Sequence, residues 1–343
     1  MKAMVYTDYG PPDVLQLSDV EKPTPNDHEL LIKVHATSVG FGDLTTRNYK
    51  AISPRKFGMP FLFWLGAKVF FGFAKPKKTI LGSEYAGVVE STGSAVTGFE
   101  AGNRVFGYRG PEFGANAEYL CVPQASLVTH TPVNLSDDEA ATLPYGALVA
   151  WNLLRKVPLQ PGQRILIHGA SGGIGSAAVQ LAKNHFGAEV TGVCSTSRVS
   201  FVKELGADEV IDYTREDFTQ NGNTYDVIFD ILGKSSFSAC KTSLTEDGRY
   251  LLASFKSRQL FQMLWTFLFG RKKVVCALSN ETPEDLVRVR ELAEAGKIKP
   301  FIDQRFPLAQ AAQAHRYIED GHRKGSVVLV VDAPSHLVGQ LDA

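Results

Sequence analysis

The sequence predicts an α/β protein that combines a strand-rich region with a doubly wound parallel sheet. A glycine-rich turn at residues 169–175 lies between an apolar run and a helical run. Apolar strands then alternate with helical segments from residue 164 to about 275, which is typical of a parallel sheet with helices on both faces. Glycine and proline interrupt the first 125 residues at short intervals, as expected where short strands are joined by turns.

Length and composition limit the classes of function. The chain has 343 residues, which favours two domains, and a formal net charge of zero, which gives no electrostatic reason to expect nucleic acid as a partner. Its four cysteines show no paired spacing, so neither a disulfide framework nor a zinc knuckle is predicted. The first residues resemble a strand and not a signal peptide, so we expect a cytoplasmic protein.

The remaining elements follow from apolar patterning and from helix caps. Strands are predicted at 1–6, 30–36, 85–91, 225–230, 248–253 and 326–331, and helices at 145–156, 283–295 and 308–320. Ser136 and Glu139 form a capping box, which predicts that a helix begins after Ser136.

The glycine-rich turn predicts a dinucleotide site. Four glycines occur within seven residues, directly after the strand 165–168 and directly before a helix over 176–186. Glycines let a pyrophosphate approach the backbone, and the helix presents free N–H groups and its positive dipole end to the phosphate. The alternative is an ordinary strand-to-helix turn, but the order strand, turn, helix is the context that the dinucleotide fingerprint requires.

The end of the next strand, 189–194, indicates which dinucleotide is bound. An NAD site has an acidic residue there to bind the ribose hydroxyls. This chain has Ser195 and Arg198 instead, and a guanidinium pairs well with a 2′-phosphate. The sequence therefore predicts NADP, although Arg198 at a helix start is also compatible with a solvated surface charge.

Two apolar stretches, residues 59–74 and 260–269, are too short or too interrupted to span a membrane. Each is flanked by lysines and arginines. Packing in a core or a homodimer interface is one interpretation. A substrate entrance or a surface that contacts a membrane is the other.

Motifs along the chain are similar to those of the medium-chain dehydrogenase/reductase superfamily, in its zinc-independent quinone oxidoreductase branch. The resemblance runs from Met1 to about Asp332. Its motifs are VHATSVGFGD (34–43), LGSEYAGVV (81–89), GNRVFG (102–107), AATLPY (140–145), the glycine turn, LGADEVIDY (205–213), FDILG (229–233) and KGSVV (324–328).

This resemblance implies the domains and the cofactor residues. It implies a GroES-like catalytic domain from 1–125 and 277–343 and a Rossmann NADP-binding domain at 126–276. The residues that it assigns to the cofactor are Gly172, Gly173 and Ile174 at the pyrophosphate, Ser195 and Arg198 at the 2′-phosphate, Tyr213 beside that phosphate, and Leu232 and Phe255 at strand ends that pass the adenosine and nicotinamide.

The resemblance also implies that the protein uses no metal. Zinc enzymes of the superfamily have Cys and His where this chain has Gly40 and Ser83, and neither replacement ligates zinc in the same way. Without a Lewis acid, hydride transfer to a quinone or a conjugated enone is favoured over alcohol oxidation. The alternatives are a zinc-independent alcohol dehydrogenase or carbonyl reductase, an enoyl-thioester reductase, and a non-catalytic NADP-binding adapter.

The substrate side departs from the branch, which often has Asn at position 40 and Thr at position 149, where this chain has Gly40 and Val149. Two candidate catalytic residues remain. Tyr145 is a hydroxyl donor or a core tyrosine, and Asp43 is a catalytic carboxylate or one that only forms structural hydrogen bonds. His35 and His168 lie in apolar strands and are expected to pack in the core.

The expected partner is a small lipophilic acceptor. In the family, Phe41, Tyr145 and the aromatic-rich stretch 61–73 follow motifs that border the substrate. Aromatic walls would favour a flat apolar molecule, because burial of apolar area contributes about 25 cal/mol per Å².

Overall fold

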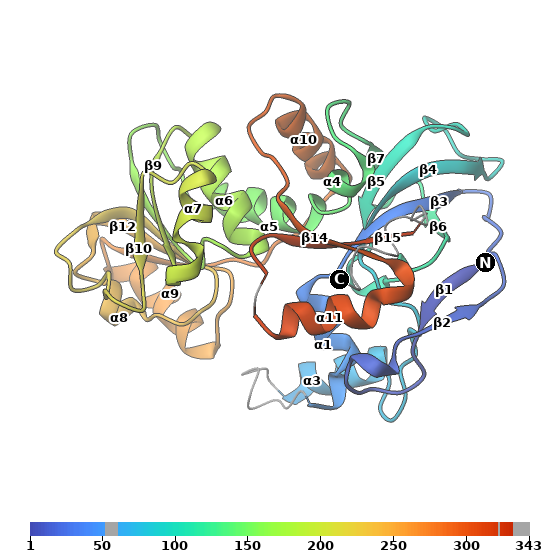
Figure 1. The fold of residues 1–343 in the computed structure, drawn as a ribbon. Helices are drawn as coiled ribbons and strands as arrows, with labels where there is room; N and C mark the ends of the chain where they lie inside the picture. The colour runs from blue at the N-terminus through green and yellow to red at the C-terminus, as the bar shows by residue number, and fades with distance from the viewer. Residues whose placement is uncertain (52–60, 322, 332–343) are drawn as a thin grey trace. The chain divides into compact units, whose positions relative to one another are not determined.

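The computed structural model describes residues 1–51, 61–321 and 323–331, and it divides the chain into two compact units (Figure 1). Unit 1 comprises Met1–Pro144, Thr282–Arg290 and Pro300–Ala343, and unit 2 comprises Tyr145–Glu281 and Glu291–Lys299. The first boundary therefore lies at Pro144, where the sequence had placed it at residue 125. Residues 52–60, which include part of the apolar stretch 59–74, lie outside the described residues.

Unit 1 is rich in β-structure. Within the described residues, a seven-stranded sheet has the order β14-β15-β3-β4-β5-β7, with β6 paired to β3, and β1 and β2 form a separate hairpin (Figure 1). The strands are β1 (Lys2–Val5), β2 (Gln16–Asp19), β3 (Glu29–Ser38), β4 (Glu84–Thr92), β5 (Arg104–Tyr108), β6 (Tyr119–Pro123), β7 (Val128–His130), β14 (Ile302–Pro307) and β15 (Ser326–Val330).

Short helices complete unit 1. They are η1 (Pro12–Val14), α1 (Phe41–Arg47), η2 (Tyr49–Ala51), α3 (Phe61–Phe71), η3 (Gly110–Glu112), α4 (Asp137–Ala140), η5 (Leu308–Gln310) and α11 (Ala311–Glu319). The capping box at α4 is confirmed, because the Ser136 hydroxyl accepts the Glu139 amide and the Glu139 carboxylate accepts the Ser136 amide.

Residues 126–144 belong to unit 1 because β7 pairs with β5 and because Asp137 is bound from two strands. Its carboxylate lies 2.6 Å from Nδ1 of His35 and accepts a 2.6 Å hydrogen bond from Arg104. Burial alone would raise the pKa of Asp137, but these two partners outweigh it and hold the pKa low. His35 is thus a polar partner of Asp137 whose side chain is 32% exposed, and the expectation of a packed core histidine was wrong for it.

Unit 2 contains a six-stranded sheet in which all neighbouring strands within the described residues are parallel. The strands are β8 (Arg164–His168), β9 (Glu189–Cys194), β10 (Glu209–Asp212), β11 (Tyr225–Asp230), β12 (Leu244–Leu252) and β13 (Lys273–Cys276). Their order, β10-β9-β8-β11-β12-β13, is that of a Rossmann fold, so the predicted fold class is confirmed. The strand order reverses between β8 and β11, and ligands of such sheets bind at this switch point.

The helices of unit 2 connect these strands. They are α5 (Pro144–Leu154), α6 (Gly173–Asn184), η4 (Thr196–Arg198), α7 (Val199–Glu204), α8 (Phe237–Cys240) and α9 (Ser257–Phe269). The residues of α10 (Pro283–Glu294) are divided between the two units. Helix α6 packs on β8 and β9. It begins at Gly173, three residues before the predicted start. Two of its first three residues are glycines, whose low helix propensity argues against a helix there.

Candidate functional site

The carboxyl edge of the parallel sheet brings most of the predicted cofactor residues together. Each of them follows the end of a different parallel strand, and parallel strands end at one edge of a sheet. Gly172, Gly173 and Ile174 follow β8, Ser195 and Arg198 follow β9, Tyr213 follows β10, Leu232 follows β11, and Phe255 follows β12. The edge therefore forms a candidate dinucleotide site within unit 2.

The glycine turn is held tightly against the neighbouring strand. The amides of Gly169 and Ala170 both donate to the Val193 carbonyl, at 3.2 and 3.1 Å. Gly169 has φ +95°, a region that side chains disfavour. A Cβ on Gly175 would lie 2.1 Å from the Gly169 carbonyl oxygen, so this glycine is required for helix α6 to approach the turn.

Gly173 differs from Gly175, because a Cβ on Gly173 would meet nothing within 4 Å. Packing within the chain therefore does not require glycine there. Gly172 is the N-cap of α6 and provides no side-chain cap, and the first amides of a helix have no intrahelical partner. Open space beside these amides and the positive end of the helix dipole fit an anionic group such as a pyrophosphate.

The segment after β9 forms the short helix η4, in which the Arg198 amide donates to the Ser195 carbonyl at 2.9 Å. The side chains of Ser195 and Arg198 are both half-buried. Tyr213 lies beside them, because its amide donates to the Cys194 carbonyl at 3.0 Å, and 58% of the residue is exposed. These residues provide two hydroxyls and one guanidinium at the place where the adenine ribose would lie.

Asp212 is a residue at this edge that sequence reasoning missed. Its carboxylate, at the end of β10, accepts hydrogen bonds from the hydroxyls of Thr196 at 2.6 Å and Thr214 at 2.7 Å. The bond from Thr196, with those from Thr214, holds the pKa of Asp212 below its usual value. The segment after β9 itself has no acidic residue, but the neighbouring strand end places a negative charge next to it.

The loop after β11 is organised by a buried carboxylate, Asp230. Its two oxygens accept the amides of Gly233 and Ser235, both at 2.9 Å. This fixes the loop that carries Leu232. A Cβ on Gly169 would lie 3.0 Å from Leu232 Cγ, so the exposed Leu232 side chain covers the beginning of the glycine turn.

Asp230 has two further partners from neighbouring strands. The Tyr250 hydroxyl of β12 donates to it at 2.8 Å, and His168 Nδ1 at the end of β8 lies 3.3 Å away. Burial would raise the Asp230 pKa, but His168, the Ser235 amide and Tyr250 outweigh it and lower the pKa. His168 was expected as an ordinary core histidine, whereas it belongs to this polar cluster at the switch point between β8 and β11.

Tyr145, the predicted hydroxyl donor, is brought to the glycine turn by the start of helix α5. The next residue is Gly146, where a Cβ would lie 2.5 Å from the Gly173 carbonyl oxygen. The backbone beside Tyr145 therefore contacts the turn, and the Tyr145 side chain is half-buried. Phe255 is also partly buried and packs against the core below the sheet edge.

Asp43 and Phe41 lie in unit 1. The Asp43 carboxylate is fully buried and accepts the amides of Gly40 and Gly82, both at 2.8 Å. Burial raises the pKa of Asp43 to about 6, although these amides oppose the change. The carboxylate thus joins the start of helix α1 to the loop before β4, where Ser83 is also buried. Phe41 at the start of α1 is 59% exposed.

Comparisons with known proteins agree with this geometry. A family model described as alcohol dehydrogenase GroES-like domain matches residues 26–133, and one described as zinc-binding dehydrogenase matches residues 205–329. A 2-methylene-furan-3-one reductase of Solanum lycopersicum is 34% identical, covering 96% of this chain and 79% of its own. An NADPH-dependent alkenal/one oxidoreductase of Arabidopsis thaliana, described as chloroplastic, is 33% identical with the same coverage.

The chain belongs to the medium-chain dehydrogenase/reductase superfamily and is quinone-oxidoreductase-like. The solved structure of the quinone oxidoreductase from Coxiella burnetii matches with a TM-score of 0.80 and 29% identity, over 96% of this chain and 99% of the other. The resemblance stated from the sequence motifs is therefore confirmed, and with it the oxidoreductase class. The cytoplasmic location stays a prediction.

Each helix in the described residues of this medium-chain oxidoreductase is too short or too polar to span a membrane. Likewise, no group of three or more His, Cys, Asp or Glu residues in the described ranges is arranged to hold a metal ion.

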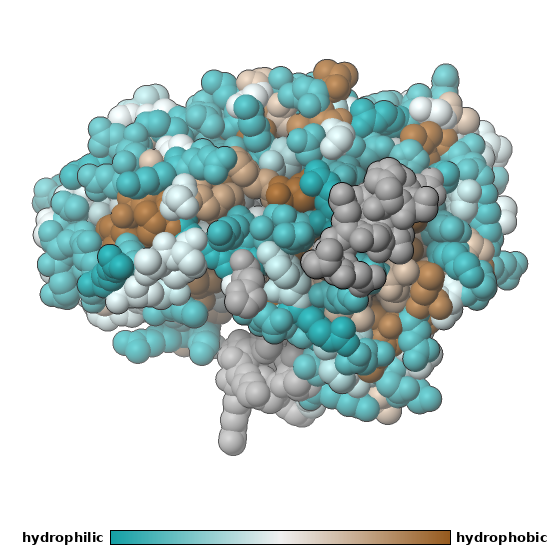
Figure 2. Space-filling model, in the orientation of Figure 1, coloured by the Kyte–Doolittle hydropathy of each residue, from teal (hydrophilic) through white to brown (hydrophobic). Residues whose placement is uncertain are grey.

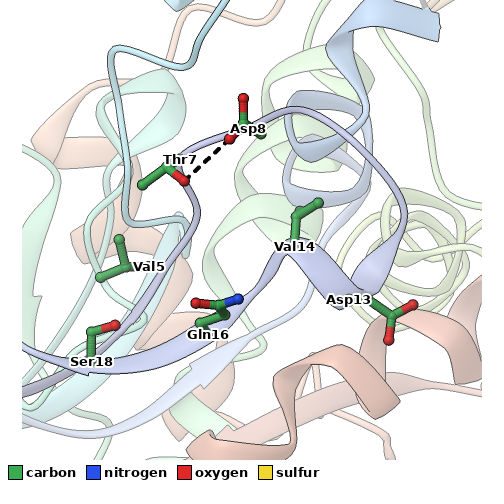
Figure 3. A pocket seen from close by; sticks show the side chains of 7 residues that line it. All are labelled: Val5, Thr7, Asp8, Asp13, Val14, Gln16 and Ser18. Carbon is green, nitrogen blue, oxygen red and sulfur yellow. Dashed lines mark hydrogen bonds between the residues drawn. The ribbon is translucent and has the colours of Figure 1, made fainter.

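A pocket on unit 1 lies apart from the predicted site residues. Figure 3 shows it between the hairpin β1–β2 and η1, where the Thr7 hydroxyl donates to Asp8 at 3.4 Å. Asp8 and Asp13 give its lining a negative charge, and none of the predicted cofactor or catalytic residues lines it. A pyrophosphate is therefore not expected there.

Proposed function

We propose that this chain is an NADPH-dependent oxidoreductase that transfers hydride, without zinc, to a quinone or to the activated C=C bond of a conjugated enone. The observation that carries the proposal is the open space at Gly173, beside the first amides of helix α6. The names of the alkenal/one oxidoreductase and quinone oxidoreductase relatives support the same chemistry.

The cofactor would be held by residues of the sheet edge. The backbone from Gly172 to Ile174 would bind the pyrophosphate through its amides, because the space in which a Cβ of residue 173 would lie is open to at least 4 Å. Leu232 and Phe255 would border the adenosine and nicotinamide halves. A bound nicotinamide supplies a hydride, which is the chemistry that the chain's own side chains lack.

The preference for NADPH over NADH would come from Ser195 and Arg198, with Tyr213 beside them. A guanidinium pairs with a phosphate through two parallel hydrogen bonds, which a ribose hydroxyl cannot match. Asp212 favours the opposite choice, because a carboxylate repels a 2′-phosphate. Its oxygens are, however, already bound by the hydroxyls of Thr196 and Thr214. We therefore propose that the site prefers NADPH to NADH.

The residues around Asp43 support an acceptor that needs no metal. Gly40 has no side chain, Ser83 offers only a buried hydroxyl, and both oxygens of Asp43 accept backbone amides. Gly40 and Ser83 therefore do not supply the Cys and His ligands of a zinc site, and the Asp43 oxygens are already occupied by backbone amides. A quinone or enone spreads the negative charge that it gains with the hydride, so hydrogen-bond donors suffice to stabilise it.

Tyr145 is the proton donor that we propose for the reduced acceptor. An acceptor that has gained a hydride carries one negative charge and is neutralised by one proton, and a positioned hydroxyl is a general acid of the required type. Asp43 acts as a positioning residue, because its oxygens are occupied by the amides that fix the start of helix α1.

The acceptor class that we propose is based on three exposed aromatic side chains in unit 1. Phe41, Phe70 and Phe73 are 59%, 40% and 56% exposed. Such groups favour flat apolar molecules, so we expect kcat/KM to rise as the apolar substituent of a quinone or enone lengthens. If short polar enones were reduced as fast as long apolar ones, these side chains would not contact the acceptor.

The cofactor assignment is tested by Gly173→Ala. The added methyl fills the space that we assign to the pyrophosphate, so NADPH affinity should fall at least tenfold. The stability of the free protein should be unchanged or slightly higher, because alanine is the better helix former. Gly66→Ala in helix α3 is the matched control, since its Cβ also meets nothing within 4 Å, and it should leave NADPH affinity unchanged.

The acceptor assignment is tested by NADPH oxidation with panels of quinones, enones, enoyl thioesters and aldehydes, before and after exhaustive chelation. Activity with quinones or enones that survives chelation supports the proposal. Alcohol-driven reduction of NADP would favour an alcohol dehydrogenase. NADPH binding without turnover of any acceptor would favour an adapter that holds NADP as a structural ligand.

A further inference from the structure

Helix α9 of unit 2 exposes an unusual amount of apolar surface. Seven of its thirteen residues are large, apolar and at least 43% exposed. They are Leu260, Phe261, Leu264, Trp265, Phe267, Leu268 and Phe269. By contrast, the hydrophobic residues on the face shown in Figure 2 lie in separate groups among hydrophilic ones.

The side of α9 that faces the protein is the more polar one. Thr266 is buried, and its hydroxyl accepts the Val274 amide at 3.0 Å. Met263 packs on the core and its sulfur lies 3.4 Å from the Cys276 amide nitrogen. Gln259 and Gln262 lie on the same side of the helix by their spacing and are half-buried. A surface helix in water has the opposite arrangement, with its apolar stripe toward the core.

The sequence of α9 and its flanks is rich in basic residues. From Gly248 to Asn280 the sequence contains six lysines and arginines and no acidic residue, although the net charge of the chain is zero. Lys256 and Arg258 are exposed at the start of the helix. At its end, Lys273 donates to the carbonyls of Thr266 and Phe267, and Arg271 pairs with Glu246 and Asp247.

We propose that α9 lies in the interface of an anionic lipid membrane, with its exposed aromatic and leucine side chains between the lipid chains. Trp, Phe and Leu on one side of a helix and basic residues at its ends are the composition of helices that lie in the plane of a membrane. The flanking lysines and arginines complement anionic head groups.

A second copy of this chain could also cover the apolar surface of α9, but the charges around the helix disfavour this contact. In a two-fold symmetric contact each surface meets itself, so Lys256 and Arg258 of one copy would approach the same basic patch of the other. Residues 248–280 contain no acidic residue, and Glu246 and Asp247 are already paired with Arg271. This inference is independent of the proposed hydride transfer, because it concerns a different surface of unit 2.

Cosedimentation of the full chain with vesicles tests the proposal. Vesicles of phosphatidylcholine with about 30% phosphatidylglycerol should sediment the protein, and pure phosphatidylcholine vesicles should bind it at least tenfold more weakly. Phe261→Ser with Leu268→Ser should abolish sedimentation. The control pair, Leu17→Ser with Val133→Ser, removes two exposed apolar side chains elsewhere and should bind as the wild type does.

Lys256→Gln with Arg258→Gln separates the charge contribution from the apolar one. Each basic residue near an anionic surface contributes about fivefold in affinity, so this pair should weaken binding to the anionic vesicles by about 25-fold. NADPH affinity and the thermal midpoint of every variant are measured alongside, and they should equal those of the wild type.

The proposal is overturned if the wild type does not sediment with anionic vesicles. It is also overturned if the protein forms a dimer that Phe261→Ser with Leu268→Ser dissociates, which would assign α9 to a second copy. Failure of NADPH binding in the wild type would refute the proposed function and leave the vesicle result unaffected.

Discussion

Asp43 in unit 1 and Asp230 in unit 2 are equally buried, but their pKa values are shifted in opposite directions. Both carboxylates are fully buried, and both accept two backbone amides at 2.8–2.9 Å. Burial nevertheless raises the pKa of Asp43 to about 6, whereas the pKa of Asp230 is lowered. Two hydrogen bonds from backbone amides are therefore not sufficient to offset the loss of water around a buried carboxylate.

The difference lies in the side chains that face each carboxylate. Asp230 also has the Tyr250 hydroxyl and the His168 ring, both from neighbouring strands of the sheet. The hydrogen bonds to Asp43 that the described part of the chain provides come from backbone amides. Asp230 thus forms a stable anion that organises the loop of Leu232, while Asp43 is poised to take up a proton near pH 6.

Removal of Asp230 should have the largest effect. Asp230→Ala leaves the amides of Gly233 and Ser235 and the Tyr250 hydroxyl without their acceptor, and each buried orphaned donor costs about 1–3 kcal/mol. We expect the free energy of unfolding to fall by about 3 kcal/mol or more, measured by urea denaturation. NADPH affinity should fall at least tenfold, because the loop that carries Leu232 loses its anchor.

Tyr250→Phe is the milder control for this variant, because it removes one donor and keeps the ring. It should cost about 1 kcal/mol and leave the loop in place. If Asp230→Ala bound NADPH as tightly as the wild type does, the loop after β11 would not contribute to the cofactor site.

The pH dependence of stability should separate the two carboxylates. Asp43 has a higher pKa in the folded protein than in the unfolded chain, so the folded state binds more protons between about pH 4 and 6. Its contribution is therefore present at low pH and is lost as the pH rises through 6, by up to about 3 kcal/mol. Relative to Asp43→Asn, the wild type should become less stable from pH 4 to 7, measured by urea denaturation.

Asp230 should show the opposite sign. Its pKa is lowered in the folded state, so its contribution is present above about pH 4 and is lost as the pH falls further. His315 also titrates, since burial and Arg47 lower its pKa to about 3, which destabilises the folded protein below pH 6.5. The difference in the free energy of unfolding between the wild type and a variant is free of the His315 contribution, because both proteins contain His315. A flat difference for Asp43→Asn would contradict the raised pKa.

Local patterns were sufficient to predict the parts of the fold that depend on neighbouring residues. The strands β9 and β11 occur where the sequence placed them, and the glycine turn has the strand, turn and helix order that its spacing required. The capping box at Ser136 is formed by residues three positions apart. In each of these cases the physical cause lies within a few residues of the feature.

The partners of the two carboxylates could not be predicted in the same way. His168 reaches Asp230 from 62 residues earlier in the chain, and Gly82 reaches Asp43 from 39 residues later. The pairing of His35 with Asp137 and the approach of Asp212 to Thr196 likewise depend on which strands become neighbours. Only the order of the strands in the sheets determines these contacts.

Arg198 follows β9 at the same sheet edge as Asp230, and we propose that its guanidinium binds the 2′-phosphate. Arg198→Ala should lower NADPH affinity by about ten- to a hundredfold, because one charge-assisted contact contributes about 1.5–3 kcal/mol. NADH affinity should change little, and the loop after β11 keeps its carboxylate anchor, unlike in Asp230→Ala. Equal affinity of the wild type for both cofactors would refute the assignment of the 2′-phosphate to Ser195 and Arg198.

Asp212 is a third strand-end carboxylate, and its removal should have the smallest effect. Its pKa is lowered by hydroxyl donors, chiefly that of Thr196, so at neutral pH it is an anion close to the proposed 2′-phosphate site. Asp212→Asn removes this repulsion and should raise NADPH affinity about two- to fivefold, as for other solvent-screened charges. NADH affinity should stay the same or fall, which fluorescence titration with both cofactors would measure. If NADH affinity fell sharply while NADPH affinity did not rise, Asp212 would be the residue that binds the ribose hydroxyls, and the edge after β9 would be an NAD site.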